Sequence, residues 1–488
     1  MSAVTFCQAG EATHEKYLTG APVMNSVNRM SNVTPPPTAT VVVVGAGYAG
    51  LSTALALHDE GVDVLVLEGS DRVGGRVLSE RIDGDLVVDH GGQWVGPTQT
   101  RLLAAAERFG CTTFPTYNTG DHLELWSDGV CRPFHGAGPD GAPGVDAYVA
   151  AAEVIDEWAA TIDLNDPTAH PRLVEWDSET VQSHLDRTVS DEDARLRLAL
   201  AVQGVWTVEP RDISLFHLLF YVASAGGFDQ LMETEGCAQE RRFTGGAQAV
   251  ALAIAEHLGY RVVLGTPVRR VETLDDGRVR VDTDRGQVLA DRVVVATSPG
   301  AAVRIRFTPP LPQARNRWME RTPMGDVAKI HTVYDTPFWR ADGYSGEATA
   351  YGDNSVGVVF DNSPDDGSVG VLVSFVYADR QHRWSALAPE QRRADVLATL
   401  SALFGERAGN PLQYLEKVWP DDPWAHGGYA ANPAPGVWTE HGATGWRTAC
   451  GSVHWAGTET SSVWNGYIDG AIDSGHRAAA EVTAALRS

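Results

Sequence analysis

The first regular hydrophobic pattern of the chain is a run of four valines that leads into a glycine-rich turn, in the stretch "ATVVVVGAGYAG" from Ala39 to Gly50. A short apolar run of this kind is typical of a strand buried on both faces of a parallel sheet. Apolar residues then recur at helical spacing from Leu51 to His58, and "VDVLVLE" predicts a second strand that ends at Glu68. Strand, turn, helix and strand together predict one βαβ unit.

In the rest of the chain, the pattern of hydrophobic and polar residues changes three times. From about Leu102 to Met232 it is rich in Ala and Leu, with scattered tryptophans, and predicts a separate helical module. Residues 259–298 predict strands, with turns at Asp275–Gly277 and at Arg285–Gly286. The last part predicts a sheet-like stretch from about 325 to 376, a helix from about Pro389 to Phe404, a strand in "VHWAG" and a long helix from about Gly466.

Composition excludes several classes of function. With 488 residues, of which 43% are hydrophobic and 21% charged, the chain is long enough for two or three globular domains. Its 63 acidic residues outnumber its 38 Lys and Arg, and the formal charge of −25 argues against binding to nucleic acid or to an anionic membrane surface. No apolar run approaches the roughly 20 residues that a membrane-spanning helix needs.

Cysteine usage and the N-terminal pattern indicate the compartment. The five cysteines show no CxxC or other metal-binding spacing, so we expect neither a metal site nor a disulfide framework. A reducing compartment, the cytoplasm, is therefore the expected location. The N-terminus lacks the pattern of a signal peptide. Residues 1–39, which are polar and end in "TPPPTAT", predict a disordered leader.

The glycine turn has the spacing of a dinucleotide-binding fingerprint. Gly45, Gly47 and Gly50 permit, in turn, a tight turn, approach of the backbone to a pyrophosphate and close helix packing. The N-terminus of the following helix offers free N–H groups to phosphate. Glu68, at the end of the second strand, is placed to bind a ribose hydroxyl, and an acid there disfavours the 2′-phosphate of NADP.

A lysine interrupts a predicted strand in "MGDVAKIHTVYDTPFWR", Met324 to Arg340. The branched and aromatic residues around Lys329 predict the strand, which Gly325 and Pro337 bound. At the edge of a sheet, the lysine would extend its ammonium to water and discourage aggregation. The alternative is a functional lysine, which the rest of the chain favours.

Five blocks of sequence, in order along the chain, resemble the flavin-containing amine oxidase family, which includes monoamine oxidases, polyamine oxidases and L-amino acid oxidases. The blocks are "EGSDRVGGRV" (Glu68–Val77), "VVDHGGQWVGPTQ" (Val87–Gln99), "GCAQERRFTGGAQAV" (Gly236–Val250), "TPMGDVAKIHTVYDTPFWR" (Thr322–Arg340) and "HWAGTETSSVWNGYIDGAIDSGHRAA" (His454–Ala479). The resemblance covers nearly all of the chain from residue 40.

The resemblance implies a two-domain α/β oxidoreductase that binds FAD. An FAD-binding, doubly wound (Rossmann-like) domain would be built from the discontinuous segments 40–112, 244–318 and 423–488. A substrate-binding α+β domain with a mixed sheet would be built from residues 113–243 and 319–422.

The resemblance also implies which residues contact FAD. Besides the glycine turn and Glu68, these are Gly75, Arg76, Gly92, Gln93, Trp94, Val268, Trp419, Gly457, Glu459 and Ile468. Paired glycines admit a bulky cofactor, and an arginine can neutralise its pyrophosphate. The predicted helix near Gly466 would direct its positive N-terminal end at the flavin pyrimidine.

Three residues match the catalytic positions of the family. Tyr429 and Tyr467 match two aromatic residues that face each other before the flavin and orient an amine. Lys329 matches a lysine that holds a water against flavin N5, and a desolvated lysine has a lowered pKa that suits it to this task at neutral pH. The positions that line the substrate pocket in the family correspond here to Met232, Gln239 and Val358.

The predicted function is oxidation of a primary monoamine to an imine, which hydrolyses to an aldehyde or ketone and ammonia while O2 is reduced to H2O2. The expected FAD is non-covalent, because Gly428 stands where covalently flavinylated relatives have a cysteine. Alternatives are an L-amino acid oxidase, or a polyamine or diamine oxidase in which Glu233 or Glu235 holds a distal ammonium. A non-catalytic flavin-binding scaffold is the alternative from another class. The expected partners are the amine and O2, and a homodimer is left open.

Overall fold

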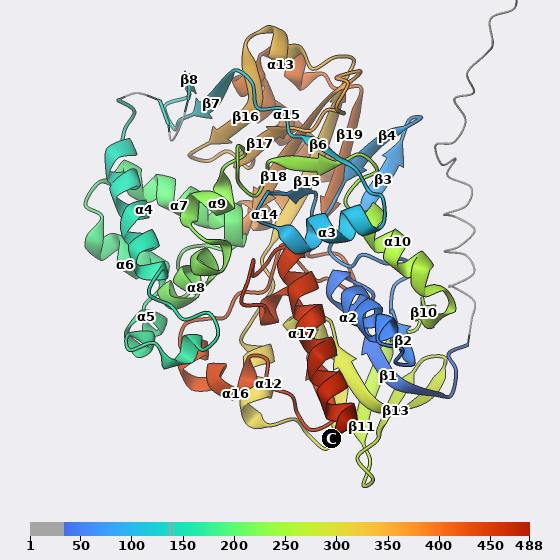
Figure 1. Cartoon of the computed structure of the whole chain (residues 1–488). Coiled ribbons are helices and arrows are strands. Elements are labelled where there is room, and N and C mark those ends of the chain that lie inside the picture. The colour runs from blue at the N-terminus through green and yellow to red at the C-terminus, as the bar shows by residue number, and fades with distance from the viewer. Residues whose placement is uncertain (1–33, 136–137, 140) are drawn as a thin grey trace, which may run out of the picture.

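The computed structural model describes residues 34–135, 138–139 and 141–488. Two large sheets, two small sheets of two and three strands, a long C-terminal helix and a separate group of helices make up the fold (Figure 1). The predicted leader, residues 1–39, lies for the most part outside the described residues. The first strand, β1 (Thr38–Val44), begins before the predicted end of that leader.

The first sheet has eight strands in the order β10–β2–β1–β13–β12–β11–β14, with β20 also paired to β13. Strand β1 is parallel to β2 and β13, and β12 is antiparallel to β11 and β13. Besides β1, the strands are β2 (Val64–Leu67), β10 (Val262–Val263), β11 (Val268–Thr273), β12 (Val279–Thr283), β13 (Gly286–Val295), β14 (Arg306–Thr308) and β20 (Val453–Trp455).

The valines of β1 are divided between two cores. Val41 and Val43 belong to the core that contains residues of helices α2 (Tyr48–Asp59), α10 (Gln248–Leu258) and α17 (Ile468–Arg487). Val42 and Val44 belong to a second core, with residues of α11 (Pro299–Ala302) and α12 (Gln313–Glu320). Because alternate side chains of a strand point to opposite faces, a valine-only strand suits a sheet covered on both sides. The predicted doubly wound, Rossmann-like domain is confirmed.

The second sheet has seven strands in the order β19–β15–β18–β17–β16–β7–β8, and it is mixed because β16 runs parallel to β7. Strand β15 pairs with both β18 and β19. Lys329 therefore lies on an interior strand, and the strand-edge interpretation of this lysine is wrong. The strands are β7 (Asp121–Leu125), β8 (Cys131–Phe134), β15 (Val327–Tyr334), β16 (Tyr344–Ala350), β17 (Val358–Asp361), β18 (Gly370–Tyr377) and β19 (Gln413–Val418).

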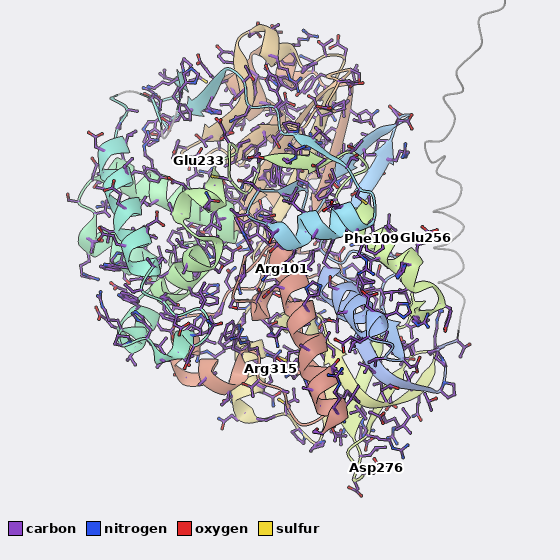
Figure 2. All side chains as sticks on the ribbon, in the orientation of Figure 1. Arg101, Phe109, Glu233, Glu256, Asp276 and Arg315 are labelled. Atoms are coloured by element: carbon purple, nitrogen blue, oxygen red, sulfur yellow. The ribbon has the colours of Figure 1, made fainter. Side chains whose placement is uncertain are left out.

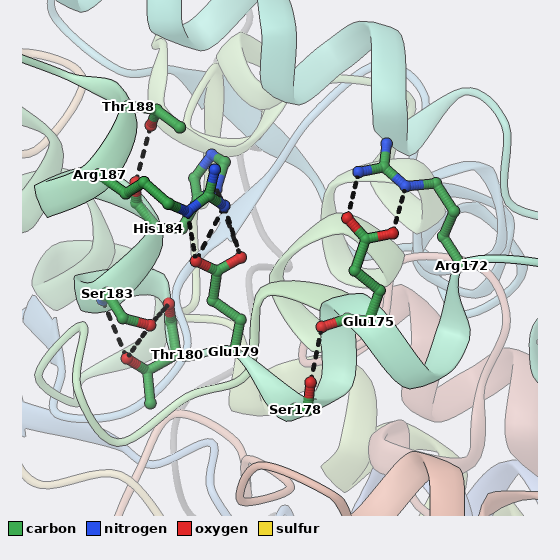
Figure 3. A network of polar contacts seen from close by, with 9 residues as sticks. All are labelled: Arg172, Glu175, Ser178, Glu179, Thr180, Ser183, His184, Arg187 and Thr188. Atoms are coloured by element: carbon green, nitrogen blue, oxygen red, sulfur yellow. Dashed lines mark hydrogen bonds and ion pairs between the residues drawn. The ribbon is translucent and has the colours of Figure 1, made fainter.

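A group of helices lies beside the two sheets (Figure 1). It comprises α4 (Val145–Ala159), α5 (Leu173–Ser178), α6 (Val181–Thr188), α7 (Glu192–Trp206), α8 (Leu215–Ala225) and α9 (Phe228–Met232). Helix α8 is buried along almost its whole length, and its partners form one core with it. At the surface, Thr180 caps α6 and ion pairs join Arg172 to Glu175 and Arg187 to Glu179 (Figure 3). Such exposed pairs contribute at most about 1 kcal/mol each, so the buried face holds this group together.

One predicted helical region contains strands. The region from about Leu102 to Met232 was expected to be helical, but β6 (Thr113–Pro115), β7 and β8 lie within it. Strand β7 is fixed by pairing with β16, more than 200 residues further along the chain. Tertiary pairing of this kind overrides the local preference that the sequence displays.

The remaining elements connect these layers. The strands are β3 (Ser79–Ile82), β4 (Leu86–Asp89), β5 (Trp94–Val95) and β9 (Arg241–Phe243). The helices are α3 (Thr100–Arg108), α13 (Phe338–Ala341), α14 (Ala378–Ser385), α15 (Pro389–Phe404) and α16 (Ala443–Gly445). Short 3-10 turns span Pro167–Ala169, Gly259–Arg261, Glu406–Gly409 and Thr458–Thr460, and a π-helical turn spans Trp438–Gly442. In the part of the chain that the structure describes, no helix has the length and apolar character needed to span a bilayer.

Candidate active site

A cavity of about 840 Å³ connects the glycine turn after β1 with residues of the mixed sheet and of helices α7, α8 and α9. Most residues predicted to bind cofactor or substrate line it. They are Gly45, Gly47, Glu68, Gly75, Arg76, Gly92, Gln93, Trp94, Val268, Trp419, Gly457 and Ile468, together with Lys329, Tyr429, Tyr467, Met232, Gln239 and Val358. Segments far apart in sequence thus meet at one site.

Glu68 lies at the carboxyl end of β2, beside the glycine turn. Its carboxylate accepts hydrogen bonds from the backbone N–H groups of Ala46, at 2.6 Å, and Ser70, at 2.8 Å. Burial raises the pKa of Glu68, and these two backbone donors oppose that rise. The position is the one that a ribose-binding acid occupies in a dinucleotide site.

Gly47, Gly75 and Gly92 leave a trough in the cavity wall, and this trough fits a dinucleotide. A Cβ placed on Gly75 would lie 3.3 Å from the Cα of Gly47, and one on Gly92 would lie 3.3 Å from Ile468. Helix α2 begins at this trough without a side-chain cap, so its first N–H groups are available to a phosphate. The buried Oγ1 of Thr297, a further lining residue, has no hydrogen-bond partner within the described residues. The residues present therefore fit the pyrophosphate of FAD.

Two predicted cofactor residues, Gly50 and Glu459, lie outside the cavity lining. A Cβ on Gly50 would lie 1.9 Å from the carbonyl oxygen of Gly45, so this glycine permits the close packing of α2 on the turn. Glu459 is buried and accepts two hydrogen bonds from Arg76, at 2.6 and 3.1 Å. Arg76 also donates to the carbonyl oxygen of Tyr429 at 2.8 Å. This pair, which the sequence did not predict, joins the trough to the loop that carries Tyr429.

Lys329 is buried, with 3% of its surface exposed. Its ammonium donates to the carbonyl oxygen of Gly91, at 2.8 Å, and to the side-chain oxygen of Gln93. Gln93 in turn donates to Asn362 at 2.8 Å. Burial lowers the pKa of Lys329 to about 7, although the nearby carboxylate of Asp89 opposes this shift. The side chain is thus desolvated, as predicted, while its role toward a cofactor stays a prediction.

The two predicted cage tyrosines occupy the same cavity. The hydroxyl of Tyr467 donates to the carbonyl oxygen of Leu231 at 3.2 Å, which fixes that ring. The ring of Tyr429 packs edge-on to Phe375, with 6.1 Å between the ring centroids. Burial raises the pKa of each tyrosine well above the ordinary value, so both remain neutral phenols at physiological pH.

Besides the two tyrosines, the cavity lining contains both apolar and acidic residues. Apolar lining residues include Leu200, Val205, Leu231, Val358, Phe360 and Phe375. Asp229, Glu233 and Glu347 also line the cavity, whereas Glu235 does not. Figure 2 shows Glu233 where the helical group meets the mixed sheet.

Glu347 was missed by sequence reasoning. Its carboxylate accepts a hydrogen bond from Thr234 at 3.2 Å and lies 3.7 Å from the imidazole of His122. Burial, and then the nearby Glu233, raise the pKa of Glu347 to about 8. A glutamate on a strand at a position without any motif carries no sequence signal of such a placement.

Comparisons with known proteins assign the chain to a family. The family described as "Flavin containing amine oxidoreductase" matches residues 48–483, and the one described as "Pyridine nucleotide-disulphide oxidoreductase" matches residues 5–86. AofH of Mycobacterium tuberculosis, named as a flavin-containing monoamine oxidase, is 40% identical over 93% of this chain and 98% of its own length.

Solved structures agree with this assignment. Cyclohexylamine oxidase from Brevibacterium oxydans is 33% identical, with a TM-score of 0.88 over 93% of this chain and 100% of that chain. Wild-type putrescine oxidase bound to putrescine is 34% identical, with a TM-score of 0.88 over 92% of this chain and 100% of that chain. The chain therefore belongs to the flavin-containing amine oxidase family, and it is an FAD-dependent enzyme that oxidises a CH–NH2 group with O2 as the electron acceptor.

Proposed function

We propose that the enzyme oxidises a primary monoamine with an apolar body. The product is an imine, which hydrolyses to an aldehyde or ketone and ammonia. The observation that carries the proposal is the apolar wall beside Tyr429 and Tyr467, formed by residues such as Val358 and Phe375. Each methylene group buried there contributes about 0.8 kcal/mol to binding, whereas a carboxylate or second ammonium on this wall would lose its hydration without a partner.

The protein supplies orientation and a dry site for this reaction. When bound, FAD supplies the two-electron acceptor for oxidation of the C–N bond. Tyr429 and Tyr467 hold the neutral amine between them, so that its α-C–H bond has a defined direction. Lys329 holds a water molecule at the same site, and its lowered pKa keeps much of it uncharged at neutral pH. The apolar wall excludes other water from the reacting bond.

FAD is bound without a covalent link. Gly428 precedes Tyr429 and lines the cavity, and glycine has no thiol that could bond the flavin. The described cysteines, Cys111, Cys131, Cys237 and Cys450, are free, and none of the four is in the cavity lining. The trough and the Arg76–Glu459 pair therefore hold the cofactor by non-covalent contacts alone.

A diamine is the second candidate substrate, and Glu347 is the observation that favours it. Together with Glu233 and Asp229, this carboxyl is suited to a distal ammonium, and one similar structure is a putrescine oxidase bound to putrescine. However, a pKa of about 8 leaves Glu347 largely protonated at neutral pH in the absence of a cation. A neutral acid attracts a second ammonium only weakly, so the monoamine remains the first candidate.

An L-amino acid is a poorer candidate. Arg76 and Arg197 line the cavity, but their guanidinium groups are paired with Glu459 and Glu124. A substrate carboxylate would have to compete with these buried carboxylates for the same donors.

The experiment is a comparison of specificity constants. We expect kcat/KM for hexylamine or a phenethylamine to exceed the values for putrescine and L-phenylalanine, measured as H2O2 formed. A clear preference for putrescine would replace the monoamine by the diamine, and a preference for L-phenylalanine would overturn both candidates.

A further inference from the structure

A third tyrosine, Tyr221, lines the cavity beside the two predicted cage tyrosines. It belongs to helix α8, and only 2% of its surface is exposed. Its ring packs against Trp206 with 5.0 Å between centroids, and against Tyr467 with 6.1 Å. The side chain is therefore held rigidly, and a rigid side chain is able to orient a ligand at low entropic cost.

The hydroxyl of Tyr221 makes no hydrogen bond with any residue that the structure describes. By contrast, the hydroxyl groups of the partly buried Tyr467 and the buried Tyr334 donate to the carbonyl oxygens of Leu231 and Ala408. This hydroxyl is not among the fully buried polar atoms that lack a partner, so it opens onto the cavity. A partner is therefore expected from whatever occupies the cavity.

The backbone makes room for this hydroxyl at the residue before Tyr467. Gly466 has a φ of +85°, and a Cβ built on it would lie 1.9 Å from the hydroxyl oxygen of Tyr221. Only glycine admits the hydroxyl at this place. The oxygen thus lies against the start of the segment that carries Tyr467.

The surroundings keep Tyr221 neutral. Burial raises its pKa well above the ordinary value, and the nearby Tyr467 and Glu459 raise it further, against the opposing charge of Arg76. A neutral phenol retains a lone pair that accepts a hydrogen bond as well as a proton that donates one.

We propose that the hydroxyl oxygen of Tyr221 accepts a hydrogen bond from an N–H of the amine held between Tyr429 and Tyr467. The inference rests on the proposed function and adds a residue that contacts the substrate nitrogen. When bound, FAD would supply the two-electron acceptor. In the substrate the α-C–H bond breaks, the hydrogen leaves with its electron pair, and the nitrogen lone pair forms the C=N bond. Positive charge therefore develops on nitrogen, and its N–H becomes a stronger donor to Tyr221. Because the interaction is stronger in the transition state than in the bound amine, it raises the rate.

The number of N–H groups on the substrate distinguishes this role from a structural one. A neutral primary amine has N–H donors, whereas its N,N-dimethyl derivative has none. Loss of the Tyr221 hydroxyl should therefore affect only the first substrate, whereas a general disturbance of the cavity would affect both.

The test compares Tyr221→Phe with wild-type holoenzyme, on hexylamine and on N,N-dimethylhexylamine. Tyr334→Phe, which also removes a buried hydroxyl but lies in a different core, is the control for folding. We expect the limiting rate of flavin bleaching by hexylamine to fall about 10-fold in Tyr221→Phe, and the rate with the dimethyl derivative to change less than about 2-fold. If the derivative is not oxidised, its inhibition constant against hexylamine serves instead and should be unchanged.

Two results would overturn the inference. One is an equal loss with both amines, and the other is no loss with hexylamine. Failure of the proposed function is a separate result, because there the wild-type flavin would stay yellow with hexylamine and with other primary monoamines.

Discussion

The ammonium of Lys329 donates a hydrogen bond to the carbonyl oxygen of Gly91 across 2.8 Å. It thereby joins an interior strand of the mixed sheet to the glycine pair that lines the cofactor trough. The bond also accounts for a lysine in the middle of a buried strand, since the alternative is an unpaired polar group in the core. The same position brings Lys329 beside Trp94, whose ring centroid lies 5.6 Å from the ammonium.

Replacement of Lys329 by methionine should lower the rate of amine oxidation or of reoxidation by O2 by about 100-fold, while FAD stays bound. Methionine preserves much of the side-chain volume and removes the nitrogen that holds the water. Stopped-flow measurement of the two half-reactions checks this, and the visible absorbance of the purified variant reports its FAD content. A variant with both half-reactions at wild-type rates would contradict the role given to Lys329.

Acid precipitation should release the flavin into the supernatant. No thiol precedes Tyr429, because that position is Gly428, so unfolding of the protein removes every contact that holds FAD. The measurement is the absorbance of supernatant and pellet after treatment with trichloroacetic acid. A yellow pellet would show a covalent link and refute non-covalent binding.

Replacement of Gly50 by alanine should lower the free energy of unfolding by about 3 kcal/mol and weaken FAD binding. The new methyl group would lie 1.9 Å from the carbonyl oxygen of Gly45, and a backbone atom cannot move aside cheaply. Gly300→Ala is the matched control, because its nearest neighbour is a Met324 side-chain atom at 3.9 Å. Urea unfolding of both variants tests the prediction, and equal stabilities would contradict the packing argument.

The preference for diamines should rise with pH if Glu347 faces the distal end of the substrate. Its pKa is raised to about 8, so its carboxylate form becomes dominant as the pH rises past that value. The neighbouring groups are Glu233, Thr234 and His122. The ratio of kcat/KM for putrescine to that for butylamine should therefore increase between about pH 7 and about pH 9, while the distal ammonium of the diamine is still charged.

Glu347→Gln should abolish this rise, because glutamine does not ionise. Glu240→Gln, at a residue outside the cavity lining, should leave the rise unchanged. A ratio that is independent of pH in the wild-type enzyme would exclude Glu347 from substrate recognition.

The sequence predicted the features that depend on residues close together in the chain. The valines of β1, the turn from Gly45 to Gly50 and the acid Glu68 form one continuous pattern, and the structure places them as expected. Helix α15 was predicted from about Pro389 to Phe404, and the structure has these bounds, with a proline at its start and a glycine after its end.

The features that were missed depend on distant parts of the chain. Arg76 and Glu459 are 383 positions apart, and neither residue alone indicates the other. Tyr221 lies on a helix that is apolar on nearly all sides, so no periodic face distinguishes the tyrosine that reaches the cavity. Lys329 was predicted to be functional only through resemblance, since hydrophobic pattern alone does not show which strands flank β15.

The most direct test of the account is anaerobic addition of a primary monoamine such as hexylamine to the yellow holoenzyme, followed by admission of air. We expect the flavin absorbance to bleach, hexanal and ammonia to form in equal amounts, and the yellow colour to return with release of H2O2. Absorbance that stays unchanged with hexylamine and phenethylamine, while putrescine or L-phenylalanine bleaches it, would contradict the assignment to primary monoamines.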